Sequence, residues 1–201
     1  AAGAVAAALG SPFPEPAAWP AETRPGPARG PLLGLFSGGT NCLEVLAVAE
    51  DLLGAVCSNV HPDPARRIAA DARPEGTHVL VDLGDDELTA GRPHPMIDPA
   101  AVADRLRAAA QAGPPGAVLV DVMLGHAAHA DPAAVLAPGL EAVTSAGGAA
   151  VAVLVGTAGD PQGLDRQARA LAEVGASVHR STARAAAQAA RVVSGSGSVS
   201  P

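Results

Sequence analysis

Six short apolar runs alternate with alanine-rich segments along most of this chain, and the alternation constrains the fold more than any other feature. The runs are rich in Val and Leu, and they fall at 32–36, 55–58, 78–83, 117–123, 150–155 and 176–179. Continuous apolar character is typical of strands buried on both faces of a sheet. The segments predicted as helices fall at 40–53, 98–112, 132–146, 162–174 and 182–193. This repetition predicts an α/β fold with a flavodoxin-like, doubly wound parallel sheet.

The two ends of the chain differ in composition from the part between them. Residues 1–30 are rich in proline and alanine and have no apolar period, so we predict a linker there. Residues 194–201 read SGSGSVSP and predict a Gly/Ser tail. The folded domain is therefore expected over 31–193. Because the start lacks both Met and basic residues, we expect a fragment of a longer chain rather than a signal peptide.

Composition excludes several classes of partner. All 13 basic residues are arginine, against 20 acidic residues, so the net charge is −7. The acidic balance and the lack of Tyr argue against nucleic-acid binding, which needs cationic surfaces and aromatic platforms. No apolar run approaches the roughly 20 residues that span a bilayer, so no membrane partner is expected. Two cysteines without metal-ligand spacing indicate a reducing compartment, and we expect a cytoplasmic protein from a GC-rich bacterial genome.

Polar clusters follow the first five predicted strands, at 37–40, 58–61, 84–86, 125–129 and 156–162. In an open parallel sheet the ligand binds outside the carboxyl ends of the strands, so these clusters are expected at one edge. The alternative explanation is that all loops at that edge are simply polar. The sequence therefore predicts a binding edge, whose chemistry depends on the individual clusters.

The turn after the first strand is a candidate anion site. Ser37, Gly38, Gly39 and Thr40 open the following helix, and glycines let backbone N–H groups turn toward an anion at the positive helix end. A phosphate or carboxylate is the expected guest. The alternative is an ordinary strand-to-helix turn in which Thr40 is the N-cap. After the fifth strand, a second candidate for binding the same anion consists of Gly156 and Thr157.

The long connection at 84–98 supplies the candidate catalytic residues. Arg92 is suited to clamping a carboxylate or phosphate, and His94 to moving a proton. His126, after the fourth strand, is a second candidate for proton transfer. Asp85 and Asp86 could hold Mg²⁺ together with substrate phosphates. The alternative is a solvated acidic turn in which Arg92 pairs with a neighbouring carboxylate and fixes the loop.

Part of this connection resembles a known family. Residues 79–99 read VLVDLGDDELTAGRPHPMIDP and resemble the signature of the FdrA family, whose members are similar to the alpha subunit of succinyl-CoA synthetase and to NDP-forming acyl-CoA synthetases. Further matches, in order, are LFSGGTNCLE at 35–44, VDVMLGHAAHADPA at 120–133 and GTAGDPQGLDRQARAL at 156–171. The resemblance covers about 32–193. It implies a ligase domain with an upstream CoA-binding domain and a beta-type partner subunit, which would hold most of any CoA or nucleotide.

The chain departs from the synthetase pattern in one informative place. The synthetases carry a phosphohistidine in a G-H-A-G-A motif after the fifth strand, whereas this chain reads GTAGDPQGLDRQ there, without His. The resemblance implies an acyl-CoA synthetase-type domain that binds a phosphorylated small molecule or acyl phosphate without the usual phosphohistidine. FdrA relatives are also linked to an oxamate carbamoyltransferase of ureide breakdown, so a carbamoyltransferase subunit is one alternative. A non-catalytic ligand-binding or assembly domain is the other.

Overall fold

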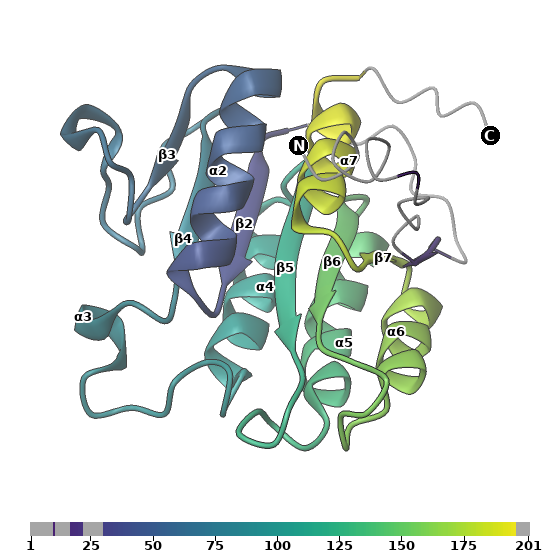
Figure 1. The fold of residues 1–201 in the computed structure, drawn as a ribbon. Helices are drawn as coiled ribbons and strands as arrows, with labels where there is room; N and C mark the ends of the chain where they lie inside the picture. Colours follow the sequence, from purple (N-terminus) through teal and green to yellow (C-terminus); the bar gives the residue numbers. More distant parts are fainter. Residues whose placement is uncertain (1–9, 11–16, 22–29, 196–201) are drawn as a thin grey trace.

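The computed structural model describes residues 10, 17–21 and 30–195, which form a layered α/β domain around one sheet (Figure 1). The strands in chain order are β1 (Ala18–Trp19), β2 (Leu32–Phe36), β3 (Val56–Ser58), β4 (His78–Asp82), β5 (Ala117–Met123), β6 (Ala149–Val155) and β7 (Ala176–His179). In space their order is β1-β7-β6-β5-β2-β4-β3. Every neighbouring pair is parallel except β1 and β7.

The strand order confirms the predicted fold. Taken alone, β2, β4, β5, β6 and β7 have the order 2-1-3-4-5, which is the flavodoxin-like arrangement. Strands β3 and β1 extend this sheet at its two edges. The predicted strands and helices all occur, with bounds that agree to within two residues.

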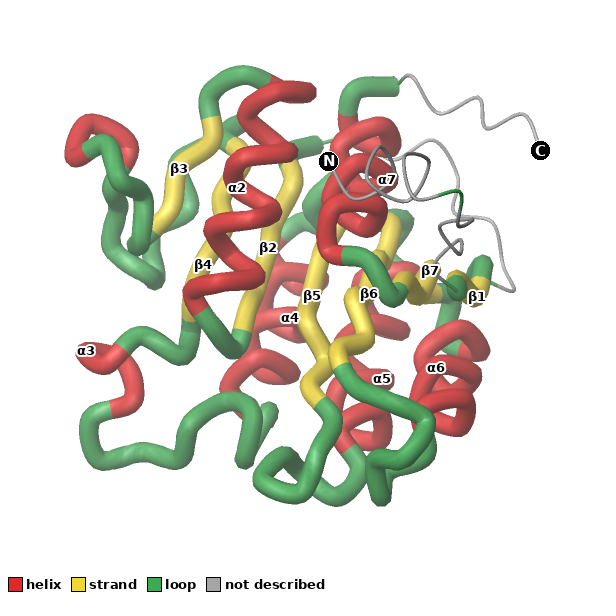
Figure 2. Tube along the Cα trace, in the orientation of Figure 1, coloured by secondary structure: helices red, strands yellow, loops and turns green. Residues whose placement is uncertain are grey.

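Helices cover both faces of the sheet. They are α2 (Gly39–Leu53), the short α3 (Asp86–Thr89), α4 (Ala100–Ala112), α5 (Pro132–Ser145), α6 (Leu164–Glu173) and α7 (Thr182–Val193), with a 3₁₀ turn η1 (Pro64–Arg66). Helices α2 and α7 lie side by side on one face, and α4, α5 and α6 lie on the other (Figures 1 and 2). None of the helices in the described residues is both long enough and apolar enough to span a membrane.

Small residues let the helices approach closely. The face of α7 against the sheet consists of four buried alanines, Ala185, Ala186, Ala189 and Ala190. Between α4 and α5, a Cβ added at Gly139 would lie 2.9 Å from Leu106 Cβ, so the contact requires glycine. Each alanine buries little apolar area, so close packing across many contacts has to supply the dispersion attraction of the core.

One strand lies in the stretch predicted as a linker. Ala18–Trp19 pairs antiparallel with β7, and Trp19 packs against the core between the sheet and α4, α5 and α6. The backbone N–H of Arg180 also donates to the carbonyl of Ala17, at 3.1 Å. The edge of β7 is therefore paired by a segment whose sequence carries no strand pattern, so the prediction of a linker is wrong at Ala18–Trp19. Most of the predicted linker, and residues 196–201 of the predicted tail, lie outside the described residues.

Candidate functional site

The loops that follow the parallel strands gather along one edge of the sheet, as predicted (Figure 2). A groove of about 380 Å³ opens there, lined by residues 37–41, His94, Met96, Asp121 and Met123. The structure thus brings together the predicted anion turn at 37–40 and His94. These residues come from the β2–α2 turn, the β4–α4 connection and the carboxyl end of β5.

The first turn of α2 is open toward the groove. The helix begins at Gly39 and its N-cap is Gly38, so the expectation that Thr40 could be the N-cap is wrong. Gly38 has extended backbone (φ −161°) and no side chain, and no side-chain hydrogen bond caps the helix. The first N–H groups of a helix have no partner within it, and together they carry partial positive charge. Gly38 through Asn41 line the groove, so this charge is presented to it.

A buried carboxylate fixes this turn. Asp121 is 4% exposed, and its Oδ1 accepts from both the backbone N–H (2.7 Å) and the hydroxyl (2.9 Å) of Ser37. Its Oδ2 accepts from Asn41 Nδ2 at 2.9 Å. Burial raises the pKa of Asp121, and these hydrogen bonds act in the opposite direction. The carboxylate therefore holds both ends of the turn and orients the start of α2.

A second buried carboxylate lies beneath the same helix end. Asp82, at the end of β4, is 5% exposed, and its Oδ1 accepts from the N–H of Gly84 at 2.8 Å. Asn59 holds the Asp82 backbone from the other side, because its amide donates to the carbonyl (3.0 Å) and accepts from the N–H (2.9 Å). A Cβ added at Gly39 would lie 3.1 Å from Asp82 Oδ2. Burial raises the pKa of Asp82, and the nearby charge of Asp85 adds to this rise.

His94 reaches the groove because residue 84 is glycine. A Cβ at Gly84 would lie 2.4 Å from the carbonyl oxygen of Ser37 and 2.7 Å from His94 Nε2. The His94 Nδ1 atom accepts from the N–H of Met96 at 3.2 Å. A neutral ring with this hydrogen bond carries its proton on Nε2. The imidazole N–H is therefore held beside the carbonyl of Ser37, at the wall of the groove.

Hydrogen bonds join the loops of this edge to one another. The side chain of Gln162 is buried; it accepts from the N–H of Gly125 (3.1 Å) and donates to the carbonyls of Gly125 (2.7 Å) and His129 (3.0 Å). The N–H of His129 in turn donates to the carbonyl of Met96, at 2.9 Å. The loops after β4, β5 and β6 therefore form one connected layer around the groove.

Several predicted residues lie outside the groove. Arg92 and His126 are exposed and are not among its lining residues. Gly156 and Thr157 also lie outside it, and their turn is closed on itself, because the N–H of Thr157 donates to Asp160 Oδ2 at 2.5 Å. The catalytic and anion-binding roles given to these four residues remain predictions.

The two aspartates proposed for Mg²⁺ have local contacts in the structure. Asp85 caps α3, where its Oδ1 accepts from the N–H of Glu87 at 2.9 Å, and Asp86 is exposed in the first turn of that helix. Among the described residues, no group of three or more His, Cys, Asp and Glu side chains could hold a metal ion. Asp85 therefore fixes the start of α3, and the magnesium role given to Asp85 and Asp86 stays a prediction.

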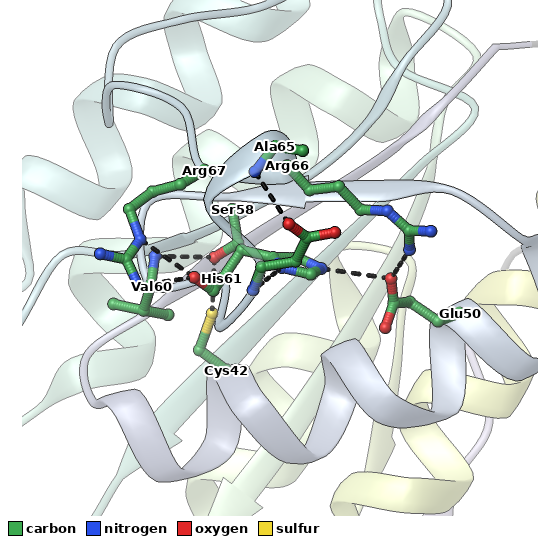
Figure 3. Close-up of polar contacts among 9 residues, drawn as sticks. Cys42, Glu50, Ser58, Val60, His61, Ala65, Arg66 and Arg67 are labelled. Atoms are coloured by element: carbon green, nitrogen blue, oxygen red, sulfur yellow. Dashed lines mark hydrogen bonds and ion pairs between the residues drawn. The ribbon is translucent and has the colours of Figure 1, made fainter.

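A second polar group of side chains lies away from the groove, against the outer part of α2 (Figure 3). In this His61 cluster (Glu50, His61, Asp63, Arg66 and Arg67), His61 Nε2 lies 3.2 Å from Glu50 Oε1, and His61 Nδ1 accepts from the N–H of Asp63 at 2.9 Å. Glu50 also pairs with Arg66, and Arg67 donates twice to the carbonyl of His61. His61 is 3% exposed, and its contact with Glu50 ties the loop after β3 to α2.

The cysteine next to this cluster is not a nucleophile. Burial raises the pKa of Cys42 to about 12, and its Sγ lies 3.7 Å from Ser58 Oγ. A thiol with this pKa is almost entirely protonated at neutral pH. Both Cys42 and Cys57 are free, and Cys42 packs into the core from the buried face of α2.

Neither buried carboxylate belongs to the polar clusters predicted after the strands. Each is the last residue of a V-L-V-D string, at 79–82 and 118–121, inside a run that is otherwise apolar. A carboxylate in a buried strand is costly unless it is hydrogen-bonded, so the repeated string was a usable signal. No sequence pattern marks the other lining residues Asn41, Met96 and Met123, because only the folded turn and loops bring them to the groove.

The comparisons with known proteins agree with this architecture. The family whose model matches the chain is described as CoA-ligase, and the match covers residues 35–192. The curated proteins similar to the chain include YahF of Escherichia coli (strain K12), described as uncharacterized, which is 34% identical over 148 residues. The match covers 71% of this chain and 28% of YahF, so the chain spans less than a third of that relative's length.

Proposed function

Because the chain belongs to the CoA-ligase family, we propose that it is an acyl-CoA synthetase-type domain, of FdrA type, whose groove binds a phosphorylated small molecule or acyl phosphate. The observation that carries this proposal is the uncapped start of α2, which opens onto the groove between Ser37 and Asn41. Backbone N–H groups at a helix start bind the oxygens of phosphates and carboxylates, and the helix dipole adds to the attraction.

The residues of the groove suggest how the domain acts on its ligand. The N–H groups of Gly38, Gly39 and Thr40 would bind the anionic group and stabilise charge that develops on it. His94, with its Nε2 proton at the groove wall, would deliver a proton during transfer. Asp121 would act as a positioning residue, because it orients the turn through Ser37 and Asn41 and has no free oxygen for the ligand.

The missing histidine favours transfer of an acyl or carbamoyl group over nucleotide-driven ligation. The loop at 156–167 contains no His, and its Asp160 is bonded to its own turn. A phosphoryl relay through this loop therefore has no histidine to carry it. Carbamoyl phosphate is an acyl phosphate with a small anionic group that suits the same turn, so a carbamoyltransferase subunit is the second candidate function.

The groove does not fit the whole CoA molecule. CoA carries a phosphorylated nucleotide with several anionic groups, whereas none of the arginines in the described part of the chain lines the groove of about 380 Å³. We therefore place no part of the reaction on CoA bound to this chain. The chain spans 28% of YahF, which leaves room in a longer protein for an upstream CoA-binding domain, and we propose such a domain and a beta-type partner subunit in the cytoplasm.

A titration of the 1–201 chain with phosphate, carbamoyl phosphate, a nucleoside diphosphate and CoA tests the proposal by calorimetry. We expect phosphate and carbamoyl phosphate to bind, and the nucleotide and CoA not to. Binding of the nucleotide or CoA alone would instead indicate nucleotide-driven ligation. If none of the four binds, the groove is not an anion site and the domain has an assembly role.

A pair of variants at residue 39 isolates one backbone N–H group. Gly39→Pro removes the N–H at the first helical position, where proline is tolerated, and the extended backbone of Gly38 suits a following proline. Gly39→Ala adds a Cβ near Asp82 but keeps the N–H. Loss of one hydrogen bond to a charged ligand costs about 2 kcal/mol, so phosphate should bind at least tenfold more weakly to the proline variant than to the alanine variant. Equal affinities would mean that the α2 start does not bind the anion.

A further inference from the structure

The two methionines of the chain both line the groove, although they lie in different elements. Met96 belongs to the connection between β4 and α4, and Met123 is the last residue of β5. Both are partly buried, and Pro95 is buried next to Met96. The chain has 2 methionines among 201 residues, and both line the same groove. Their chemistry therefore indicates which part of a ligand they would contact.

The backbone around these side chains is fixed, while the side chains themselves can adapt. Met96 donates its N–H to His94 Nδ1 (3.2 Å) and accepts at its carbonyl from His129 (2.9 Å). Met123 Sδ lies 3.8 Å from Asn41 Nδ2, the amide that also binds Asp121. Methionine is unbranched and polarizable, so it packs against apolar groups of irregular shape. The two side chains therefore form an adaptable apolar wall beside the anion turn.

The charges of the groove limit what else the ligand can carry. Among the lining residues the ionisable groups are His94 and Asp121, and no arginine belongs to this set. If the ligand carried a carboxylate in addition to its phosphate group, no arginine among the lining residues would pair with that carboxylate. The added charge would also approach the carboxyl group of Asp121. Desolvating an unpaired charge is costly, so such a ligand is disfavoured.

From this wall and this charge distribution, we infer that the groove selects an anion with a short, uncharged aliphatic body. This inference rests on the proposed function and names the substrate class of the same site: an acyl phosphate whose acyl chain carries no second acid. The anionic group binds the N–H groups of residues 38–40, and the aliphatic chain packs on Met96 and Met123. These two methionines are specificity-determining residues.

Three stable phosphonates separate the contributions of the anion, the chain and a second charge. Calorimetric titration of the 1–201 chain compares methylphosphonate, butylphosphonate and 3-phosphonopropionate at one pH. A fully buried methylene strengthens binding about fourfold, so three partly buried methylenes should make butylphosphonate bind about tenfold more tightly than methylphosphonate. The carboxylate of 3-phosphonopropionate should remove this gain or reverse it.

Variants of Met96 test whether the wall supplies the gain. Met96→Gln keeps the length of the side chain but makes it polar, and it should abolish the tenfold preference for butylphosphonate over methylphosphonate. Met96→Leu is the apolar control and should keep the preference. Met123→Gln and Met123→Leu give an independent pair if thermal unfolding shows that a Met96 variant is not folded.

The outcomes distinguish the inference from the proposed function on which it rests. If methylphosphonate and butylphosphonate bind equally, the anion site stands and the inference is wrong. The inference is also wrong if 3-phosphonopropionate binds most tightly of the three, or if Met96→Gln and Met123→Gln both leave the butyl preference intact. If no phosphonate binds and inorganic phosphate does not bind either, the proposed function itself fails.

Discussion

The groove and the His61 cluster both border α2, and both contain buried polar side chains. They differ in how the hydrogen bonds of these side chains are arranged. In the His61 cluster the histidine uses both ring nitrogens, and Glu50 accepts from two partners (Figure 3). At the groove, Asp121 also has both oxygens engaged, but the hydrogen bonds it accepts hold a turn at the start of α2, where no side chain caps the helix. A network that closes on itself stabilises the fold, whereas one that orients unpartnered donors prepares a binding site.

This difference shows why polar side chains alone are a weak guide to a site. His61 lies among two arginines and two carboxylates, an arrangement that looks chemically rich in the sequence and in space. The groove has fewer ionisable side chains, and its proposed binding groups belong to the backbone. The most direct test is to disturb each network and to measure stability and anion binding separately.

The largest effect is expected from Asp121. Asp121→Ala leaves the N–H and hydroxyl of Ser37 and the amide of Asn41 without their acceptor inside the protein. Each buried donor without a partner costs about 1–3 kcal/mol, so we expect the free energy of unfolding to fall by about 3 kcal/mol. Phosphate binding should weaken at least tenfold, because the start of α2 is no longer held. Urea unfolding and calorimetry give the two values.

Asp121→Asn is the milder companion to this variant. An asparagine keeps one oxygen that can accept from Ser37, but its amide faces the amide of Asn41, so we expect a loss of about 1 kcal/mol. If both variants bind phosphate like the unchanged chain, orientation of the turn by Asp121 has no part in binding, and the contrast between the two networks disappears.

A smaller and purely structural effect is expected from His61. His61→Ala removes its contacts with Glu50 and with the N–H of Asp63, and it empties the buried position of the ring. The free energy of unfolding should fall by about 2 kcal/mol, with no change in phosphate affinity. Arg107→Ala, which breaks an exposed pair with Asp104 on α4, is the control and should cost less than about 0.5 kcal/mol. A loss of phosphate binding in His61→Ala would contradict the separation of the two regions.

Much of the fold could be read from the sequence, because local and global signals agree there. Continuous Val/Leu runs between alanine-rich segments have few solutions other than a parallel sheet covered on both faces, and the observed strands and helices follow the predicted ranges. The exceptions are informative. The strand at Ala18–Trp19 has no local pattern of its own and forms because β7 offers an unpaired edge.

The site could be predicted only in part. The turn at 37–40 and His94 were found because glycines after a strand and a histidine between prolines are visible locally. Arg92 lies in the same loop, yet the loop's path leaves its side chain outside the groove, and no local signal states that path. The lack of a side chain at Gly84 leaves room for the His94 ring. Gly84 also lies against the carbonyl of Ser37, which is 47 residues away along the chain. Such contacts between distant segments appear only once the fold exists.

The smallest effect expected is a pH dependence of anion binding set by Asp82. Burial raises the pKa of this carboxyl, which lies against Gly39 at the start of α2. As the pH rises through the raised pKa, the carboxylate becomes charged beneath the proposed anion site and repels the ligand. Sulfate keeps its charge over roughly pH 5 to 8, so its affinity should fall by about fivefold, or roughly 1 kcal/mol, as the pH rises.

Asp82→Asn isolates the contribution of the Asp82 carboxyl to this effect. The asparagine keeps an oxygen for the N–H of Gly84 and has no charge to gain, so the fall in sulfate affinity that Asp82 causes should be absent from this variant. The same raised pKa of Asp82 determines how the stability of the fold depends on pH. A raised pKa means that the carboxyl's contribution is full below the ordinary pKa of aspartate and is lost as the pH rises through the raised value. Asp82→Asn should therefore not lower the unfolding temperature at pH 8; if it does, the ionised carboxylate stabilises the turn, and the two buried aspartates act alike.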